Sequence, residues 1–345
     1  MIWSRPLGSA CRPLGITGRH GAEKTALSRR APCIGRIAIR WATLLVLSLA
    51  VGGGSAAGAA PCFNPADPDD IRLWPGPAPA AIGDDACRDI PFLKVFRAPG
   101  QDIGPALVLI PGGGYDRLSN AREQEPVAAY FARHLRITTF VLSYRLVQAD
   151  GTYRFPVPLW DGRRAVRLVR ALAPHYSIDP RRIGIFGFSA GGHLASVIAF
   201  RPGDDFGLSR RDATDDVDDG VAVLGLGYPV ITMDAGDAPA SASARHLLSG
   251  YRGAERAALE RRLSAQNLVG PHTPPVFLFD GLDDQRVSPE NSRLLARSLQ
   301  AAGVPAAVYW FDHGPHGAGL ATGVPGESAW PDLFQQWLRE RGFLP

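Results

Sequence analysis

Ser189 lies at the centre of the run Gly187-Phe188-Ser189-Ala190-Gly191, between an apolar run at 182–186 and a helical pattern at 191–199. A serine on a sharp turn from strand to helix exposes its hydroxyl, and larger side chains at the glycine positions would collide with both elements. The chemistry of such a serine is acyl transfer, in which its oxygen attacks a carbonyl carbon. A chain with 39 glycines also produces this pattern by chance, with Ser189 as a helix N-cap, so catalytic partners are required.

The first partner is a carboxylate that orients the base. Three candidates, Asp280, Asp283 and Asp284, follow the apolar run at 276–279. We choose Asp284 as the acid, with Asp283 as the alternative. An ordinary surface turn rich in Asp and Gly is the competing interpretation for each of them.

The second partner is the base that takes the serine proton. His313 and His316 follow the apolar run at 307–311. Glycines and a proline around His316 predict a loop of fixed shape that presents its ring, so we choose His316, with His313 as the alternative. His193 lies on the helix predicted after Ser189, and we expect it to be structural.

Donors for the oxyanion are expected after the apolar run at 106–110, where Gly112, Gly113 and Gly114 follow one another. Glycines allow the backbone to approach a substrate closely. We predict that the N–H groups of Gly113, Gly114 and Ala190 stabilise the oxyanion. A plain flexible loop is the alternative.

These residues must be positioned by alternating strands and helices around a mainly parallel sheet, the arrangement that the apolar runs after residue 61 predict. The predicted strands are Phe92–Phe96, Ala106–Ile110, Thr138–Tyr144, Arg182–Phe186, Val221–Gly225, Val276–Phe279 and Ala307–Phe311. The predicted helices are Glu123–His134, Asp161–Leu172, Gly191–Ala199, Ala254–Leu263, Pro289–Ala302 and Trp330–Arg341. Several strand runs consist only of apolar residues, which is typical of burial on both faces.

Two further expectations concern the surface. The helical pattern at 163–170 contains four arginines, and we expect them to form a solvated basic face. The segment at 229–274 is short and is the only candidate for a cap over the site, so we expect a small cap or none. One domain is expected from residue 61 to residue 345.

Residues 1–60 have the layout of a leader with a signal peptide, in which Arg36 and Arg40 precede an apolar run and a stretch of small residues. We expect cleavage at about 57–60 and a secreted or periplasmic protein. Because the apolar run is too short to cross a bilayer, no stable membrane insertion is expected after processing. A membrane anchor and a twin-arginine export route are the alternatives.

Removing the leader changes both the charge and the cysteine content. Residues 1–60 hold eight of the 37 basic residues and one of the 33 acidic residues, which leaves 29 basic against 32 acidic residues. Nucleic-acid binding therefore has no electrostatic support. Cys62 and Cys87 remain, and in an exported protein we expect them to form a disulfide, with two free thiols as the alternative.

The chain resembles the acetyl-esterase branch of the α/β-hydrolases, near the acetylxylan esterases and the feruloyl-esterase-like domains. The resemblance covers most of the chain after residue 70 and includes the segments 73–76, 110–115, 140–146, 187–196, 228–232, 274–278, 287–292 and 316–317. It implies the α/β-hydrolase fold, with Ser189 as nucleophile, Asp284 as acid and His316 as base. In two places the chain departs from that branch, because Asp280 stands where a histidine is frequent and Ala318 where an aromatic residue is frequent.

The resemblance implies a serine esterase that hydrolyses short-chain esters of carbohydrates, acetyl esters first, with neither a metal nor an organic cofactor. The enzymatic alternatives are a general short-chain carboxylesterase or lipase, a feruloyl esterase and a formamidase-type amidase. An inactive hydrolase fold that only binds its ligand is the alternative of another class.

Overall fold

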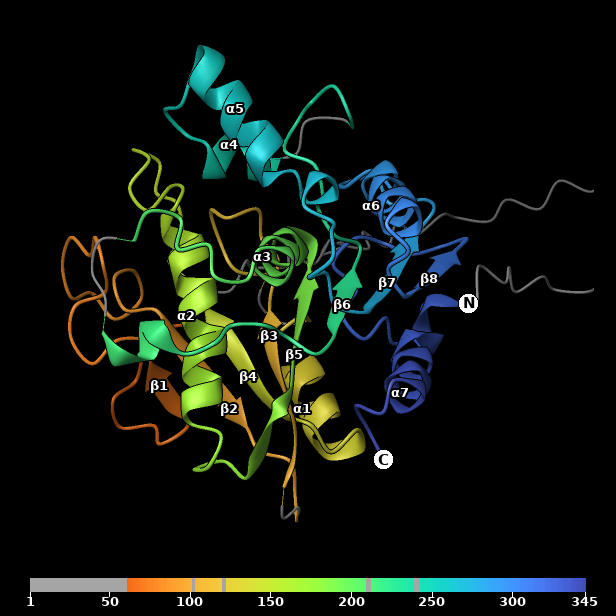
Figure 1. Ribbon diagram of the computed structural model, residues 1–345, viewed down its shortest axis with the longest axis horizontal. Helices are drawn as coiled ribbons and strands as arrows, with labels where there is room; N and C mark the ends of the chain where they lie inside the picture. The colour runs from red at the N-terminus through yellow and green to blue at the C-terminus, as the bar shows by residue number, and fades with distance from the viewer. Residues whose placement is uncertain (1–60, 101–102, 120–121, 209–211, 239–241) are drawn as a thin grey trace, which may run out of the picture. The chain divides into compact units, whose positions relative to one another are not determined.

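The structure, a computed structural model, describes residues 61–100, 103–119, 122–208, 212–238 and 242–345. Its central element is an eight-stranded sheet in the order β1-β2-β4-β3-β5-β6-β7-β8 (Figure 1). β2 pairs antiparallel with both β1 and β4, and every other pair in the sheet is parallel. The leader predicted for residues 1–60 lies outside the described residues.

After β3 the strands and helices alternate along the chain, except that two helices, α4 and α5, lie between β6 and β7. The strands are β1 (Asp70–Arg72), β2 (Phe92–Phe96), β3 (Gly104–Ile110), β4 (Thr138–Ser143), β5 (Ile178–Phe188), β6 (Leu224–Gly227), β7 (Val276–Gly281) and β8 (Ala306–Phe311). The helices are α1 (Glu125–His134), α2 (Val157–Ala171), α3 (Ser189–Phe200), α4 (Ala242–Leu247), α5 (Gly253–Leu263), α6 (Glu290–Ala301) and α7 (Trp330–Glu340).

The core consists of two apolar clusters, one on each face of the sheet. In β3, Val108 and Ile110 belong to the cluster that also contains residues of α2, α3 and α6, whereas Leu107 and Leu109 belong to the cluster formed with α1 and α7 (Figure 1). All four side chains are fully buried. This confirms the prediction of strands buried on both faces, since successive side chains of a strand point to opposite faces.

The secondary structure differs from several of the predicted elements. The sixth strand lies at Leu224–Gly227 rather than at Val221–Gly225. β5 begins at Ile178 rather than at Arg182, and α2 begins at Val157 rather than at Asp161. Two short elements, β1 and α4, were not predicted. β1 is the tripeptide Asp-Ile-Arg, which contains no apolar run, and it forms because it pairs with β2. α4 has six residues, too few to show a helical period.

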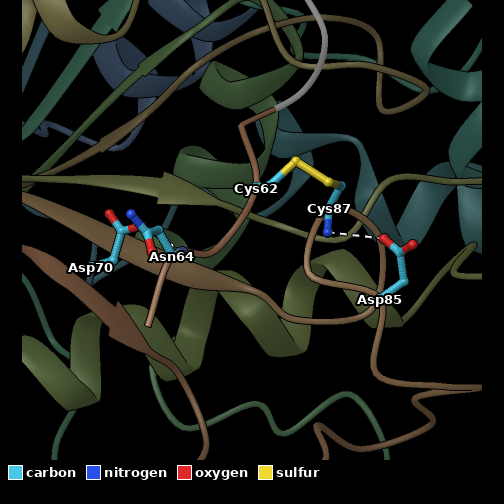
Figure 2. The surroundings of a disulfide bond; sticks show 5 residues. All are labelled: Cys62, Asn64, Asp70, Asp85 and Cys87. Atoms are coloured by element: carbon cyan, nitrogen blue, oxygen red, sulfur yellow. Dashed lines mark hydrogen bonds between the residues drawn. A yellow bond between two sulfur atoms is a disulfide. The ribbon is translucent and has the colours of Figure 1, made fainter. Parts of the chain in front are cut away.

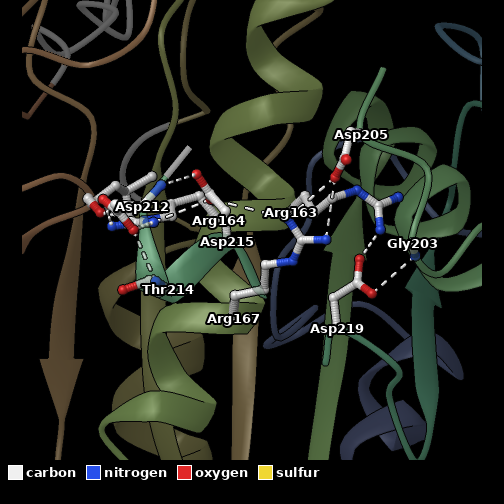
Figure 3. A network of polar contacts seen from close by, with 10 residues as sticks. Arg163, Arg164, Arg167, Gly203, Asp205, Asp212, Thr214, Asp215 and Asp219 are labelled. Carbon is white, nitrogen blue, oxygen red and sulfur yellow. Dashed lines mark hydrogen bonds and ion pairs between the residues drawn. The ribbon is translucent and has the colours of Figure 1, made fainter. Parts of the chain in front are cut away.

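The expectation of a solvated basic face on α2 was wrong. Arg163, Arg164 and Arg167 are at most 5% exposed. Arg164 forms a bidentate ion pair with Asp212, at 2.5 and 2.9 Å (Figure 3). The carboxylates that pair with these arginines come from the segment that follows α3: Asp205, Asp212, Asp215 and Asp219. The network attaches that segment to α2, a contact distant in sequence that helical periodicity does not reveal.

The disulfide expected between Cys62 and Cys87 is present in the structure (Figure 2). Hydrogen bonds hold the chain next to both cysteines. The Cys87 N–H donates to Asp85 Oδ1 at 2.9 Å, and the Asn64 N–H donates to Asp70 Oδ2 at 2.9 Å. The bridge therefore fastens the first described residues to the loop that precedes β2. Within the described ranges, no helix combines the length and apolarity needed to cross a membrane.

Candidate active site

Ser189 is the first residue of α3 and follows directly on the last residue of β5. Its φ is +51°, a left-handed conformation that is strained for a residue with a side chain. The turn is tightly packed: a Cβ on Gly191 would lie 2.2 Å from the Ile110 carbonyl oxygen, and one on Gly187 would lie 2.3 Å from the Gly191 carbonyl oxygen. Glycine is therefore required on both sides of the serine, as the sequence pattern indicated.

His316 lies between Ser189 and Asp284. Its Nε2 atom is 2.8 Å from Ser189 Oγ, and its Nδ1 atom is 2.6 Å from Asp284 Oδ2. The other carboxylate oxygen, Asp284 Oδ1, accepts hydrogen bonds from the N–H groups of Arg286 and Val287 at 2.8 and 3.0 Å. Since Asp284 only accepts hydrogen bonds, the proton of the neutral ring lies on Nδ1 and Nε2 faces the serine hydroxyl.

The two alternative residues form a separate pair. His313 Nδ1 lies 3.0 Å from Asp283 Oδ2, and the two side chains are 74% and 49% exposed. Asp283 Oδ1 also accepts the Gly314 N–H at 2.8 Å. The hydrogen bond from Gly314 and the neighbouring His313 lower the pKa of Asp283. No hydrogen bond joins this pair to Ser189 in the described part of the chain.

The glycine loop after β3 adopts conformations that favour glycine, with φ of +117° at Gly113 and +71° at Gly114. A Cβ on Gly113 would lie 2.3 Å from the Arg117 carbonyl oxygen. The Gly112 N–H already donates to Glu123 Oε2 at 2.8 Å, so it is not the donor that a substrate would meet. Gly113 and Gly114 remain as the predicted donors of this loop. The N–H of Ala190 lies in the first turn of α3, where helical N–H groups have no partner within the helix.

His193 is fully buried and connects three segments. Its Nε2 donates to the Leu263 carbonyl oxygen at 2.7 Å, which leaves Nδ1 to accept the hydroxyl proton of Tyr115 at 2.7 Å. Burial lowers the pKa of His193 to about 4, so the ring is neutral near pH 7. This ring therefore joins the glycine loop, through Tyr115, to α3 and to the end of α5.

The segment predicted as a small cap carries α4 and α5, and it contacts the glycine loop directly. His246 on α4 donates from Nδ1 to the Gly114 carbonyl oxygen at 2.8 Å. The same atom lies 3.4 Å from Asp116 Oδ1. The position of Gly114 is thus fixed from the cap side as well as by its own backbone.

Sequence reasoning missed three buried side chains at the site: Glu123, Tyr228 and Glu327. Glu123 was placed only at the start of a helix, and its hydrogen bond to Gly112 has no signal in the sequence. Glu327 is fully buried, and neither of its carboxylate oxygens has a hydrogen-bond partner among the described residues. Burial, with a smaller effect of Asp280 and Asp284, raises the pKa of Glu327 to about 8.

Asp280 is also fully buried. Its Oδ2 accepts the Ser292 hydroxyl at 2.5 Å. Burial chiefly, together with the charge of Asp284, raises the pKa of Asp280 to about 7. No group of three or more His, Cys, Asp or Glu side chains in the described ranges is arranged to hold a metal ion.

A mainly parallel sheet of this strand order, with a serine on the turn from β5 to α3 and a histidine after β8, defines an α/β-hydrolase. The chain belongs to the BD-FAE family, whose profile matches residues 95–299. The resemblance found in the sequence is confirmed by this match.

Two curated proteins and one solved structure show the same relationship. The acetylxylan esterase of Xylanibacter ruminicola is 32% identical over 250 residues, which are 71% of this chain and 46% of that protein. The endo-1,4-beta-xylanase B of Butyrivibrio fibrisolvens is 34% identical over 221 residues, which are 63% of this chain and 33% of that protein. The crystal structure of the acetyl ester-xyloside bifunctional hydrolase of Caldicellulosiruptor lactoaceticus superposes with a TM-score of 0.71 at 35% identity and covers 84% of this chain and 100% of that one. The chain thus spans less than half the length of either curated relative.

Proposed function

We propose that this chain is an exported serine esterase that hydrolyses short-chain esters of carbohydrates, with acetyl esters as the preferred substrates. The observation that carries the proposal is the hydrogen-bonded series from Ser189 Oγ through His316 to Asp284, with distances of 2.8 and 2.6 Å. A serine, a histidine and an aspartate in this order form the machinery of acyl transfer. The names of the relatives, an acetylxylan esterase and an acetyl ester-xyloside hydrolase, support acetyl groups on sugars as the substrate.

In the first half of the reaction, Ser189 Oγ attacks the ester carbonyl carbon while His316 Nε2 takes the hydroxyl proton. Asp284 holds the Nδ1 proton of His316 and stabilises the imidazolium that forms. The carbonyl oxygen becomes an oxyanion, which accepts hydrogen bonds from the N–H groups of Gly113, Gly114 and Ala190. When the intermediate collapses, the bond to the alcohol oxygen breaks and His316 gives its proton to that oxygen.

In the second half, water resolves the acyl-enzyme. His316 Nε2 takes a proton from the water as its oxygen attacks the acyl carbon, and the bond to Ser189 Oγ then breaks. The serine oxygen recovers its proton from His316, and the carboxylic acid leaves. Each step uses Nε2 of the same ring, so the orientation that Asp284 imposes on His316 serves both halves.

Ser189→Ala tests the nucleophile. We expect the variant to lose hydrolysis of p-nitrophenyl acetate by about 10⁴-fold or more, because acyl transfer has no other nucleophile in the proposed mechanism. Intact mass after treatment with an activated organophosphonate should show one adduct on the wild type and none on the variant. A variant that hydrolyses at the wild-type rate would show that Ser189 is not the nucleophile.

The substrate class is tested by measuring acetate release from acetylated xylo-oligosaccharides, beside hydrolysis of longer p-nitrophenyl esters, methyl ferulate and an N-formyl amide. We expect the highest kcat/KM on the acetylated oligosaccharides. Turnover of p-nitrophenyl acetate without acetate release from any sugar ester would favour a general carboxylesterase instead.

Export is the remaining part of the proposal, and the disulfide between Cys62 and Cys87 supports it, since disulfides persist in oxidising compartments. The full chain should be expressed with its own leader, followed by cell fractionation and N-terminal sequencing. We expect a secreted or periplasmic protein that begins close to Pro61. Recovery from the cytoplasm with residues 1–60 still attached would contradict export.

A further inference from the structure

Glu123 forms hydrogen bonds to two segments of the site although it lies in neither. The side chain is 1% exposed. Its Oε2 accepts the Gly112 N–H at 2.8 Å, and its Oε1 accepts the Tyr228 hydroxyl at 3.0 Å. The same hydroxyl oxygen accepts the Gly319 N–H at 3.0 Å. Through these contacts Glu123 connects the glycine loop, the chain that follows β6 and the loop that carries His316.

Glu123 also lies close to the base. A Cβ on Gly317, the residue after His316, would be only 3.7 Å from Glu123 Oε1. The ring of Tyr228 lies between the two groups in the network, with its centroid 5.0 Å from the centroid of the His316 ring. A Cβ on Gly112 would be 2.7 Å from Ser189 Cβ and 2.9 Å from Glu123 Oε2, so the glycine loop is packed between the serine and this carboxylate.

The hydrogen bonds indicate the charge state of Glu123. Both of its oxygens accept a proton donor, the Gly112 N–H and the Tyr228 hydroxyl, and this arrangement fits a carboxylate. Burial raises the pKa of Glu123, while the hydrogen bonds and the nearby His316 favour its ionised form. Among the residues that the structure describes, no Lys or Arg side chain forms an ion pair with Glu123. A positive charge that forms on His316 would therefore interact favourably with this buried carboxylate.

We propose that Glu123 is a positioning residue. Its hydrogen bonds hold the glycine loop at a fixed position relative to the loop that carries His316, and its charge places a second carboxylate beside His316. The inference rests on the proposed function, because a positive charge forms on His316 only while that ring acts as the base. Two consequences follow. Glu123 fixes the distance between the oxyanion donors and the base, and it makes protonation of His316 more favourable than Asp284 alone would.

Other titratable groups face these two side chains, and the test must account for them. Around Glu123 they are Tyr144, Tyr228 and His316; around His316 they are Asp284, Tyr228 and Glu123. Burial raises the pKa values of both tyrosines, so neither changes charge between pH 4 and 9. A change in the acidic part of the pH profile therefore reports on the carboxylates and on His316.

The experiment compares Glu123→Gln with the wild type by the rate of Ser189 phosphonylation and by kcat/KM on p-nitrophenyl acetate, each from pH 4 to 9. Glutamine keeps the size of the side chain and removes its charge. The acidic limb of the pH–rate profile is the part in which the rate rises as the base loses its proton. Since loss of a nearby negative charge lowers the proton affinity of an imidazole, we expect the midpoint of this limb to shift to lower pH by roughly half a pH unit or more. The plateau rate should fall roughly 10- to 100-fold, because the glycine loop and the loop that carries His316 are no longer held together by the Glu123 carboxylate.

Two control variants separate the charge from the packing. Glu125→Gln alters an exposed glutamate two residues along the chain and should match the wild type. Tyr228→Phe removes both hydrogen bonds of the Tyr228 hydroxyl, the one to Glu123 and the one from the Gly319 N–H, but keeps the charge of Glu123. It should therefore lower the plateau rate and leave the pH of the acidic limb unchanged. If the glutamine variant does not fold, Glu123→Asp replaces it. Shortening the side chain by one methylene moves the carboxylate away from His316, which should also shift the midpoint of the acidic limb to lower pH.

The outcomes separate this inference from the proposed function. A wild type that is not phosphonylated at Ser189 removes the proposed function itself. If the wild type is phosphonylated at Ser189 but the acidic limb of the Glu123 variants has the same midpoint as that of the wild type, only the inference about Glu123 is overturned, whatever happens to the plateau rate.

Discussion

The Nδ1 atom of His316 lies 2.6 Å from the Oδ2 atom of Asp284. The orientation of this carboxylate is set by its own loop, because its other oxygen accepts the N–H groups of Arg286 and Val287. Asp284 is 5% exposed, whereas the neighbouring Asp283 points to an exposed histidine. Two aspartates that are adjacent in sequence thus have different environments, and they provide a matched comparison.

Asp284→Asn should lower kcat by about 10³- to 10⁴-fold, because an amide can present its NH2 group to Nδ1 and favour the tautomer in which Nε2 carries the proton. Asp283→Asn should leave kcat within about threefold of the wild type, since surface changes away from the site have small effects. Steady-state kinetics with p-nitrophenyl acetate measure both. If Asp283→Asn is the variant that loses activity, the assignment of the acid is wrong.

Arg164→Ala should destabilise the fold by about 3–5 kcal/mol, since it removes an ion-pair partner of the buried Asp215 carboxylate. Arg164 is 2% exposed, and its guanidinium contacts both Asp212 and Asp215. Urea unfolding followed by circular dichroism measures the change. Arg181→Ala is the control: its ion pair with Asp179 has an arginine side chain that is 88% exposed, and no measurable change is expected. Equal effects of the two variants would contradict the buried network.

The arginine network also shows where sequence reasoning stops. Local signals were sufficient for most of the strands, because unbroken apolar runs such as 106–110 specify both an extended chain and burial on two faces. They were sufficient for the turn at Ser189 because the strand run, the flanking glycines and the helical pattern follow one another directly in the sequence, although the contact that requires Gly191, with the Ile110 carbonyl oxygen, is distant in sequence. The partners of Arg164 lie 48 and 51 residues away in the sequence, so a charged helix face gave no sign of its burial.

The same limit applies to the site. Asp284 and His316 were found because each follows a predicted strand, and the carboxyl ends of parallel strands meet at one edge of a sheet. It did not suggest Glu123, whose contacts depend on the path of a loop and on a tyrosine 105 residues further along the chain. The local sequence does not indicate whether a glutamate near the start of a helix is buried or exposed. Only tertiary structure distinguishes them.

The disulfide should contribute to stability and not to catalysis. Cys62 and Cys87 close a loop of 25 residues, and the chain-entropy model assigns about 3 kcal/mol to such a loop. The double variant Cys62→Ser with Cys87→Ser should therefore unfold at lower urea concentration while its kcat stays unchanged. Adding dithiothreitol should lower the stability of the wild type towards that of the double variant and leave the double variant unaffected. A loss of kcat in the folded double variant would show that the bridge supports the site.

Asp280→Asn should stabilise the protein in a manner that depends on pH. The pKa of Asp280 is raised to about 7 in the folded protein, whereas an unfolded aspartate titrates near its ordinary value of about 4. Between these values the native state holds a proton that the unfolded chain has released, so the free energy of unfolding falls as pH rises from about 4 to about 7. Asparagine does not ionise and can still accept the Ser292 hydroxyl. The stability difference between variant and wild type should therefore grow across this window and reach on the order of 2–4 kcal/mol at pH 8.

Urea unfolding of both proteins at pH 4.5, 6 and 8 measures this difference. Asp84→Asn is the matched control because Asp84 is exposed, and its difference from the wild type should be the same at all three pH values. A constant offset for Asp280→Asn would mean that the buried carboxyl does not change its protonation on unfolding, and the electrostatic account of Asp280 would then be wrong. A growing offset would show that the buried Asp280 carboxyl destabilises the wild type once the pH is high enough for it to ionise beside Asp284.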